Sequence, residues 1–173
     1  MHDFLPDVLH ELRRQKRLAD AALAQLNDDD FFRPPAAHVN SIAIIVKHLA
    51  GNLASRWTEF LTTDGEKADR NRDNEFHLAE GDTRARLSVG WEAGWDALFA
   101  TLNGLTSADL NRSVTIRGEP HTVLQAVLRG LSHFSYHVGQ ILYLVRMLRP
   151  DSDWLTVRPG TSRSVSGEYR KSP

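Results

Sequence analysis

The stretch from Thr122 to Leu148 constrains the fold most, because its apolar residues recur at the three- and four-residue spacing of an α-helix. The periodic positions are Leu124, Val127, Leu128, Leu131, Phe134, Val138, Ile141, Leu142, Val145 and Leu148. Thr122 and Gln125 form a capping-box pattern at the start of this run. A helix with such an apolar stripe must bury it against another element of the domain. The sequence therefore predicts a long helix that packs on a shared core.

Three further stretches have the same periodicity, and each begins at a residue that can cap a helix. They are expected to run from Asp3 to about Asn27, from Asn40 or Ser41 to about Thr63, and from Asp82 to about Leu105. The chain shows no strand pattern of any length and no internal repeat. Its 173 residues fit one domain that can bury a core without disulfides. These features predict an all-α fold, a four-helix bundle with long connectors and an irregular C-terminal tail.

The connectors between the expected helices are unusually long. Phe31 and Phe32 precede two prolines that cannot continue a helix, and the aromatic pair is expected to cover an end of the core. The polar link 64–81 has about eighteen residues, more than a usual connection, so it is either functional or partly disordered. Between 107 and 120, the stretch 114–116 is expected to form a short extended or hairpin piece.

Three histidines lie on the expected apolar stripes of two different helices. His133 and His137 are four residues apart, so both project from one helix face. His48 lies among Ile44, Ile45, Leu49 and Trp57 on another helix. Imidazoles at this spacing can reach one ion at a nitrogen distance of about 2.0–2.1 Å. The pattern predicts a metal site of His48, His133 and His137, whereas hydrogen-bonded core histidines are the alternative interpretation.

The residues around these histidines narrow the class of metal site. A zincin helix needs Glu after its first histidine, but position 134 is Phe. Di-iron bundles need repeated Glu-x-x-His motifs, which this chain lacks. There is no cysteine, so thiolate ligands, disulfides and a cysteine nucleophile are excluded. A mononuclear divalent ion on three neutral imidazoles remains, and Zn²⁺, Ni²⁺ and Fe²⁺ all suit these ligands.

Neighbouring residues in the last helix allow further expectations. Gln140 faces the same way as His137 and either orients that ligand or bonds elsewhere in the interior. Gly139 suggests a close approach of another helix. Tyr136 is expected to point about 100° away from His137 and to serve packing, and no residue stands out as a general base. The remaining histidines are expected to be solvated or to cap helices: His2, His10, His38, His77 and His121.

The overall charge excludes several classes of partner. With 21 basic and 22 acidic side chains, the net charge of −1 gives no electrostatic basis for binding nucleic acid or an anionic membrane surface. The amino terminus has no pattern of a secretion signal, and no apolar run reaches membrane-spanning length. We therefore expect a soluble, cytoplasmic protein.

Several of these segments resemble the DinB/YfiT-like superfamily of metalloenzymes, in a branch of unknown function. The resemblance covers nearly the whole chain and is carried most specifically by Ser41–Asn52, Thr115–Val123, His133–Ile141 and Leu155–Gly160. It implies a four-helix bundle of a mirror variant of the up-and-down topology. It also implies that His48, His133 and His137 hold one divalent metal and that the protein forms dimers.

The resemblance implies an activity as well, because relatives include thiol transferases that use bacillithiol and an isomerase that uses mycothiol. A bound metal can lower the pKa of a small thiol and present a thiolate to an electrophile. The function predicted from the sequence is therefore metal-dependent thiol transfer to a small electrophile. The alternatives are a metal-dependent hydrolase and a non-catalytic metal-binding or stress-associated scaffold.

Three further expectations concern the bounds of the bundle, the oligomeric state and the pH dependence of metal binding. We predict a metal-binding bundle over residues 1–150 and a tail over 151–173 that packs on it and frays at its end. A homodimer is expected because Trp57, Phe60, Phe99 and Trp154 exceed what one small core can bury. Metal is expected to be lost below about pH 6, because each ligand must be a neutral imidazole with an ordinary pKa of about 6.5.

Overall fold

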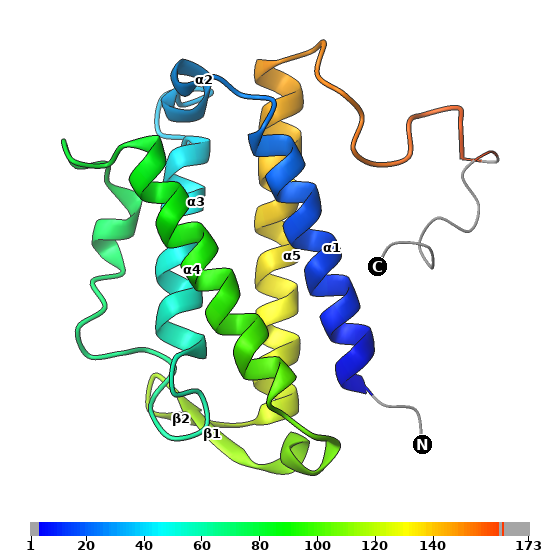
Figure 1. Cartoon of the computed structure of the whole chain (residues 1–173). Helices are drawn as coiled ribbons and strands as arrows, with labels where there is room; N and C mark the ends of the chain where they lie inside the picture. The colour runs from blue at the N-terminus through cyan, green and yellow to red at the C-terminus, as the bar shows by residue number, and fades with distance from the viewer. Residues whose placement is uncertain (1–3, 163, 165–173) are drawn as a thin grey trace.

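Four long helices run alongside one another in the computed structural model, which describes residues 4–162 and 164 (Figure 1). Within this part the protein is mostly helical, and a short hairpin closes one end. The elements in chain order are α1 (Phe4–Leu23), α2 (Asp28–Phe32), α3 (Ile42–Trp57), the 3-10 helix η1 (Asp73–Phe76), α4 (Arg84–Asn103), the 3-10 helix η2 (Ser107–Asn111), β1 (Ser113–Ile116), β2 (Glu119–Thr122) and α5 (Val123–Leu148).

Polar side chains fix where the long helices begin. The Ser41 hydroxyl accepts a hydrogen bond from the backbone N–H of Ile44 and caps α3. Thr122 and Gln125 make both bonds of the predicted capping box at the start of α5. Thr83, and not Asp82 as predicted, caps α4. The Asp82 carboxylate instead accepts hydrogen bonds from Lys47 Nζ and the backbone N–H of Ala79.

Two predicted helix ends are wrong. The first helix ends at Leu23 rather than near Asn27. Asn27 instead caps the short helix α2, which occupies a stretch that was expected to be a loop. The third element in the chain, α3, ends at Trp57 rather than at Thr63. The expected role of the aromatic pair is confirmed for Phe31, which is 2% exposed within the core cluster.

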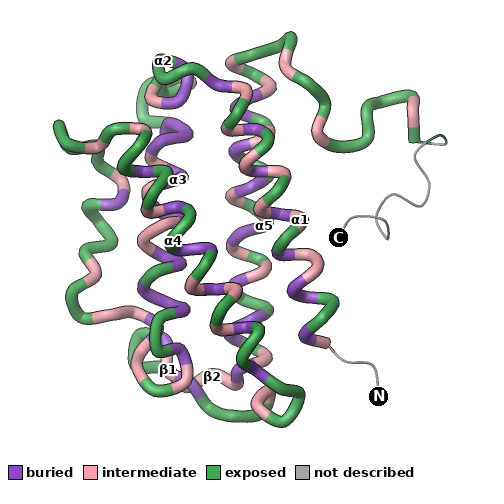
Figure 2. Tube along the Cα trace, viewed as in Figure 1, coloured by how far each residue is buried: buried purple, intermediate pink, exposed green. Residues whose placement is uncertain are grey.

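The buried residues line the space between the long helices (Figure 2). Trp91 and Trp95, one turn apart on α4, are both buried in the core. The helix α3 packs mainly on α4, and α1 packs mainly on α5. A Cβ at Gly94 would lie 2.8 Å from Leu53 Cβ, so glycine permits the close approach of α4 to α3. Gly139, predicted to have this role, is exposed with open space around it.

The hairpin makes the all-α description only approximate. Antiparallel β1 and β2 pair Val114 with His121 and Ile116 with Glu119, which confirms the expected hairpin piece. The Asp64 carboxylate accepts hydrogen bonds from the backbone N–H groups of Arg117 and Gly118, at the tip of this hairpin. The link 64–81 is thereby tied to the end of the molecule where α5 begins, beside α3.

The tail contacts the long helices through a few residues. The Arg146 guanidinium of α5 lies 4.4 Å from the Trp154 ring centroid, and Leu155 packs against the core cluster. The predicted fraying concerns residues that lie mostly outside the described part of the chain. Among the helices of residues 4–162, none has the length and apolar character needed to cross a membrane.

Candidate metal centre

The helix α5 carries two of the predicted ligands on one face. Phe134 and Val138, each next in sequence to one of these histidines, are fully buried, and this burial fixes the rotation of α5 against the core. His133 and His137 are consequently held half-buried and one turn apart, with ring centroids separated by 4.7 Å. The helix thus presents two imidazoles side by side, as the four-residue spacing predicted.

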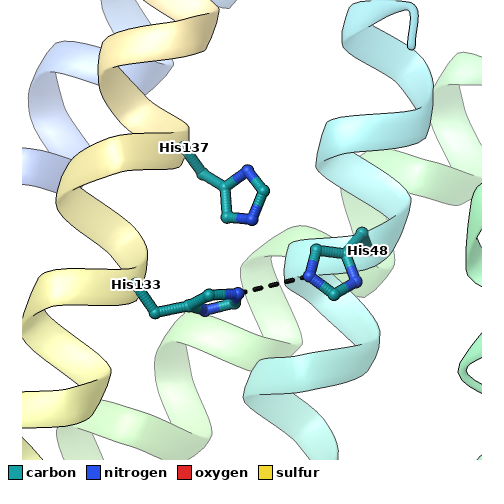
Figure 3. Close-up of side chains that lie close together, drawn as sticks. All are labelled: His48, His133 and His137. Carbon is teal, nitrogen blue, oxygen red and sulfur yellow. Dashed lines mark hydrogen bonds between the residues drawn. The ribbon is translucent and has the colours of Figure 1, made fainter.

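His48 meets them from the opposite helix (Figure 3). It is 4% exposed, and its neighbours Ile45 and Leu49 are buried in the core. His48 Nε2 lies 3.2 Å from His133 Nε2, and the His48 and His137 rings are 5.1 Å apart between centroids. One nitrogen from each of the three histidines lies within 4.8 Å of the others. Among the described residues, this is the one group of at least three His, Cys, Asp or Glu side chains that could hold a metal ion.

The spacing of these nitrogens fits a tetrahedral ion. Two nitrogens bound to one tetrahedral centre at about 2.0–2.1 Å are separated by about 3.3–3.4 Å. The distance of 3.2 Å between His48 Nε2 and His133 Nε2 is close to this value. His48 and His133 therefore already have the spacing of two ligands of one ion, and a nitrogen of His137 lies within 4.8 Å of both.

Glu75 supports His48 from the link between α3 and α4. Its Oε2 lies 2.8 Å from His48 Nδ1, and its carboxylate also accepts two hydrogen bonds from Arg70. Burial opposes the ionisation of Glu75, but the hydrogen bonds with His48 and Arg70 outweigh it and the pKa of the carboxyl lies below its usual range. A Cβ at Gly51 would lie 2.3 Å from Glu75 Oε1, so the glycine gives the carboxylate its room.

Sequence reasoning missed Glu75 and Arg70. The link was recognised as long and polar, but it has no periodicity that marks one acidic residue as buried. Glu75 is 7% exposed because Arg70 and His48 both bond to it. The link therefore contributes a buried carboxylate to the candidate site.

Gln140 orients the third histidine. Its carbonyl Oε1 lies 2.8 Å from His137 Nδ1, which confirms the interpretation that it bonds to this ligand. A carboxylate and a carbonyl oxygen can only accept hydrogen bonds, so the proton of His48 and of His137 sits on Nδ1. Each Nε2 is then unprotonated, and His48 Nε2 accepts a hydrogen bond from His133 Nε2 at 3.2 Å. Two lone pairs therefore face the shared centre before any ion binds.

The electrostatic environment keeps the α5 histidines neutral. Burial, followed by the neighbouring His137 and His48, lowers the pKa of His133 to about 3. Burial also lowers the pKa of His137 to about 4, although the hydrogen bond with Gln140 acts in the opposite direction. Neutral imidazole is the form that binds metal.

We expect metal to be retained below pH 6, in contrast to the expectation from ordinary histidine pKa values. Protons compete with metal only below the pKa of each ligand, so the lowered pKa values of His133 and His137 move release to lower pH. The same shifts mean that the metal-free protein loses stability as pH falls from about 6.5, where unfolded histidines take up protons first. NMR titration of the imidazole carbon-bound protons measures both ligands. Titration of His133 and His137 near pH 6.5 would contradict this account.

A cavity of about 530 Å³ opens beside the histidines. It lies between α3 and α5, and the residues 72–76 and the hairpin tip contribute to its wall. Its lining comprises His48, Asn52, Arg56, Arg72, Phe76, Arg117, Arg129, Ser132, His133, Tyr136 and His137. Three protein ligands leave at least one coordination position, and a cavity beside it is typical of catalytic rather than structural sites.

Tyr136 does not have the packing role that was expected. Its side chain is 53% exposed and lines the cavity, and its ring centroid is 5.2 Å from that of His133. The expectation was wrong because a tyrosine side chain is long enough to turn back over the neighbouring histidine.

The other histidines were predicted to be solvated or to cap helices, and a solvated position is confirmed for two of them. His38 and His77 are exposed, whereas His10 and His121 are half-buried. His121 Nε2 is 3.1 Å from Arg129 Nη1 at the start of α5. His2 lies outside the described residues.

A solved structure described as "Crystal structure of the conserved protein of locus from Enterococcus faecalis" is similar, with a TM-score of 0.63 and 16% sequence identity. The similarity covers 86% of this chain and 98% of that chain, and at this identity it shows a shared fold alone. No curated protein matches the sequence. Residues 1–161 match the family model described as "Protein of unknown function (DUF1572)". The chain therefore belongs to the DUF1572 family.

Proposed function

We propose that this protein is a metal-dependent enzyme of the DinB/YfiT-like superfamily, with the mirror variant of the up-and-down four-helix bundle. His48, His133 and His137 hold one divalent ion, which is Zn²⁺, Ni²⁺ or Fe²⁺ by ligand type. The observation that supports it best is the cavity beside the histidines, since a non-catalytic metal site is normally closed by protein ligands. The hydrogen bonds that Glu75 and Gln140 accept from His48 and His137 support it too, because they hold two imidazoles in the ligating tautomer.

The proposed reaction is transfer of a small thiol to an electrophile. The ion would supply Lewis acidity that lowers the pKa of a thiol in the cavity. The thiol proton passes to solvent, the sulfur forms a bond to the electrophilic carbon, and the leaving group departs with its bonding pair. The chain's residues position the reactants. Tyr136 and Phe76 supply ring surfaces in the cavity wall, and Asn52 supplies a polar group one turn from His48.

Metal analysis and a thiol screen test this proposal. Native protein should contain about one divalent ion per chain. It should then accelerate the reaction of bacillithiol, mycothiol, glutathione or coenzyme A with a chromogenic aryl halide. The variant His133→Ala should lose this acceleration, whereas the exposed-site variant His77→Ala should keep it. Ester cleavage without thiol transfer would identify the hydrolase, and a bound metal without either activity would favour the scaffold.

We also infer that the protein forms a homodimer, but not by all of the residues first expected, although Trp154 is exposed as expected. Trp57 and Phe60 are 1% and 5% exposed, so one chain does bury them and that part of the prediction is wrong. Exposed apolar side chains instead follow α5, at Leu128, Tyr136, Tyr143 and Met147. Exposed apolar patches often mark an interface. Sedimentation equilibrium at micromolar concentration should give twice the chain mass of 19.5 kDa, and a mass near the single value would contradict the dimer.

A further inference from the structure

One guanidinium in the cavity wall is buried without an ion-pair partner among the described residues. Arg56 of α3 is 5% exposed, and its Nε has no hydrogen-bond partner. Within the described residues, its guanidinium forms no hydrogen bond or ion pair. A buried charge without a partner costs stability, so it is retained in a fold only where something else compensates. The position of Arg56 in the cavity wall indicates that the compensation comes from a ligand.

The charges near Arg56 increase this need for an anion. Arg72, Arg117 and Arg129 line the same cavity, and no acidic residue is among its lining residues. Burial, followed by the charge of Arg129, lowers the pKa of Arg56 to about 10. Glu66 is the acidic residue whose charge opposes this lowering, and its carboxylate already forms ion pairs with Arg70 and Arg117. The cavity therefore has a strongly positive local potential that the net charge of the whole chain conceals.

The positive end of the cavity has a defined place relative to the histidines. Arg56 follows His48 by two turns of α3, or about 12 Å, and Arg129 precedes His133 by one turn of α5, or about 6 Å. Because α3 and α5 run in opposite directions, both arginines lie on the same side of the histidines (Figure 1). Asn52 lies between His48 and Arg56 on α3, is 6% exposed, and lines the cavity. One end of the cavity thus ligates a metal, and the other end offers donors to an anion.

We propose that this cavity binds a small organic anion whose carboxylate or phosphate group lies at Arg56 and Arg129. Asn52 contacts the middle of the molecule, and its reactive end lies at the three histidines. The placement of the reactive end at the three histidines rests on the proposed metal-dependent function, whereas the anion site at Arg56 and Arg129 does not. Guanidinium groups suit both anions because their N–H donors match two oxygens at once. The site therefore selects substrates by a negative charge roughly 6–12 Å from the reacting atom.

The test uses inorganic phosphate and succinate as probes, and neutral acetamide as a blank. Calorimetric titration of metal-free wild-type protein should show binding of phosphate or succinate. The probe that binds with the lower Kd shows whether the site prefers a phosphate or a carboxylate group. Arg56→Gln and Arg129→Gln should each weaken this binding about tenfold or more, because each removes charge-assisted hydrogen bonds. Arg86→Gln, which removes an exposed arginine of α4 outside the cavity, should leave it unchanged.

Thermal unfolding distinguishes a ligand-binding Arg56 from a structural one. Without added anion, Arg56→Gln should raise the melting temperature by about 2–4 °C, because it removes an unpaired buried charge. Phosphate or succinate should stabilise the wild type by mass action but not this variant. A lowered melting temperature in Arg56→Gln, together with unchanged anion affinity in Arg129→Gln, would overturn the proposal.

The anion site and the metal site can fail independently. Anion binding that depends on Arg56 in a protein that takes up no metal would keep the anion site and refute the metal-dependent function. Uptake of one metal by a protein whose anion affinity is the same in wild type, Arg56→Gln and Arg129→Gln would refute the anion site alone. Repeating the succinate titration after metal loading shows whether both ends of the cavity act on one ligand.

Discussion

Replacing His133 by Ala is expected to lower metal affinity by more than about a hundredfold. Removing a residue that only hydrogen-bonds to a metal ligand typically costs about 10- to 100-fold in affinity, and removing a ligand itself costs more. His133 Nε2 faces His48 Nε2 at 3.2 Å, so its removal leaves at most two imidazoles for the ion. The helical content should stay nearly unchanged, because the His133 side chain is half-buried at the cavity and lies outside the core cluster. Competition with a chelator measures the affinity, and far-ultraviolet circular dichroism measures the helices.

His77→Ala is the matched control for this experiment. His77 is exposed and lies near Glu75 in sequence, but it is not in the three-histidine group. Its replacement should change metal affinity by less than about twofold, because a surface substitution of this kind usually has little effect. If His133→Ala bound metal as tightly as His77→Ala, the three histidines would not be the site.

Replacing Glu75 by Gln is expected to lower metal affinity by about 10- to 100-fold, although Glu75 is not itself a member of the three-histidine group. The carboxylate accepts from His48 Nδ1 and so directs the Nε2 lone pair at the centre. Glutamine lacks the negative charge that strengthens this bond, and it can donate as well as accept. It also weakens the bonds from Arg70 that hold the link in place.

Glu80→Gln is the control for Glu75→Gln, because it removes an exposed carboxylate from the same link. It should bind metal like the wild type. Equal affinities for both variants would show that Glu75 only anchors the link through Arg70.

The three histidines could be predicted because they lie in periodic helices. In a helix, residues four apart share a face, so the sequence positions of His133 and His137 almost determine their relative placement. That His48 faces them followed from its apolar stripe, because such a stripe must turn toward the core. The same reasoning could have identified Arg56, which lies eight residues after His48 on the same face of α3. Its charge suggested a solvated position, and only the structure shows that it is buried.

Glu75 could not be predicted by this reasoning. It lies in the link 64–81, where the path of the backbone depends on tertiary contacts such as those of Asp64 with the hairpin tip. The helix ends at Leu23 and Trp57 were misplaced for a related reason. Short polar segments near both ends can continue a helix, cap another one or form a turn, and packing selects among these with small differences in free energy.

The most direct test of the account is X-ray absorption spectroscopy of the zinc-loaded protein. We expect a first shell that includes three imidazole nitrogens at about 2.0–2.1 Å, with the outer-shell scattering that histidine rings produce. The His133→Ala variant should lose part of that ring scattering. A first shell of oxygens without histidine scattering in the wild-type protein would contradict the assignment of His48, His133 and His137 as the metal ligands.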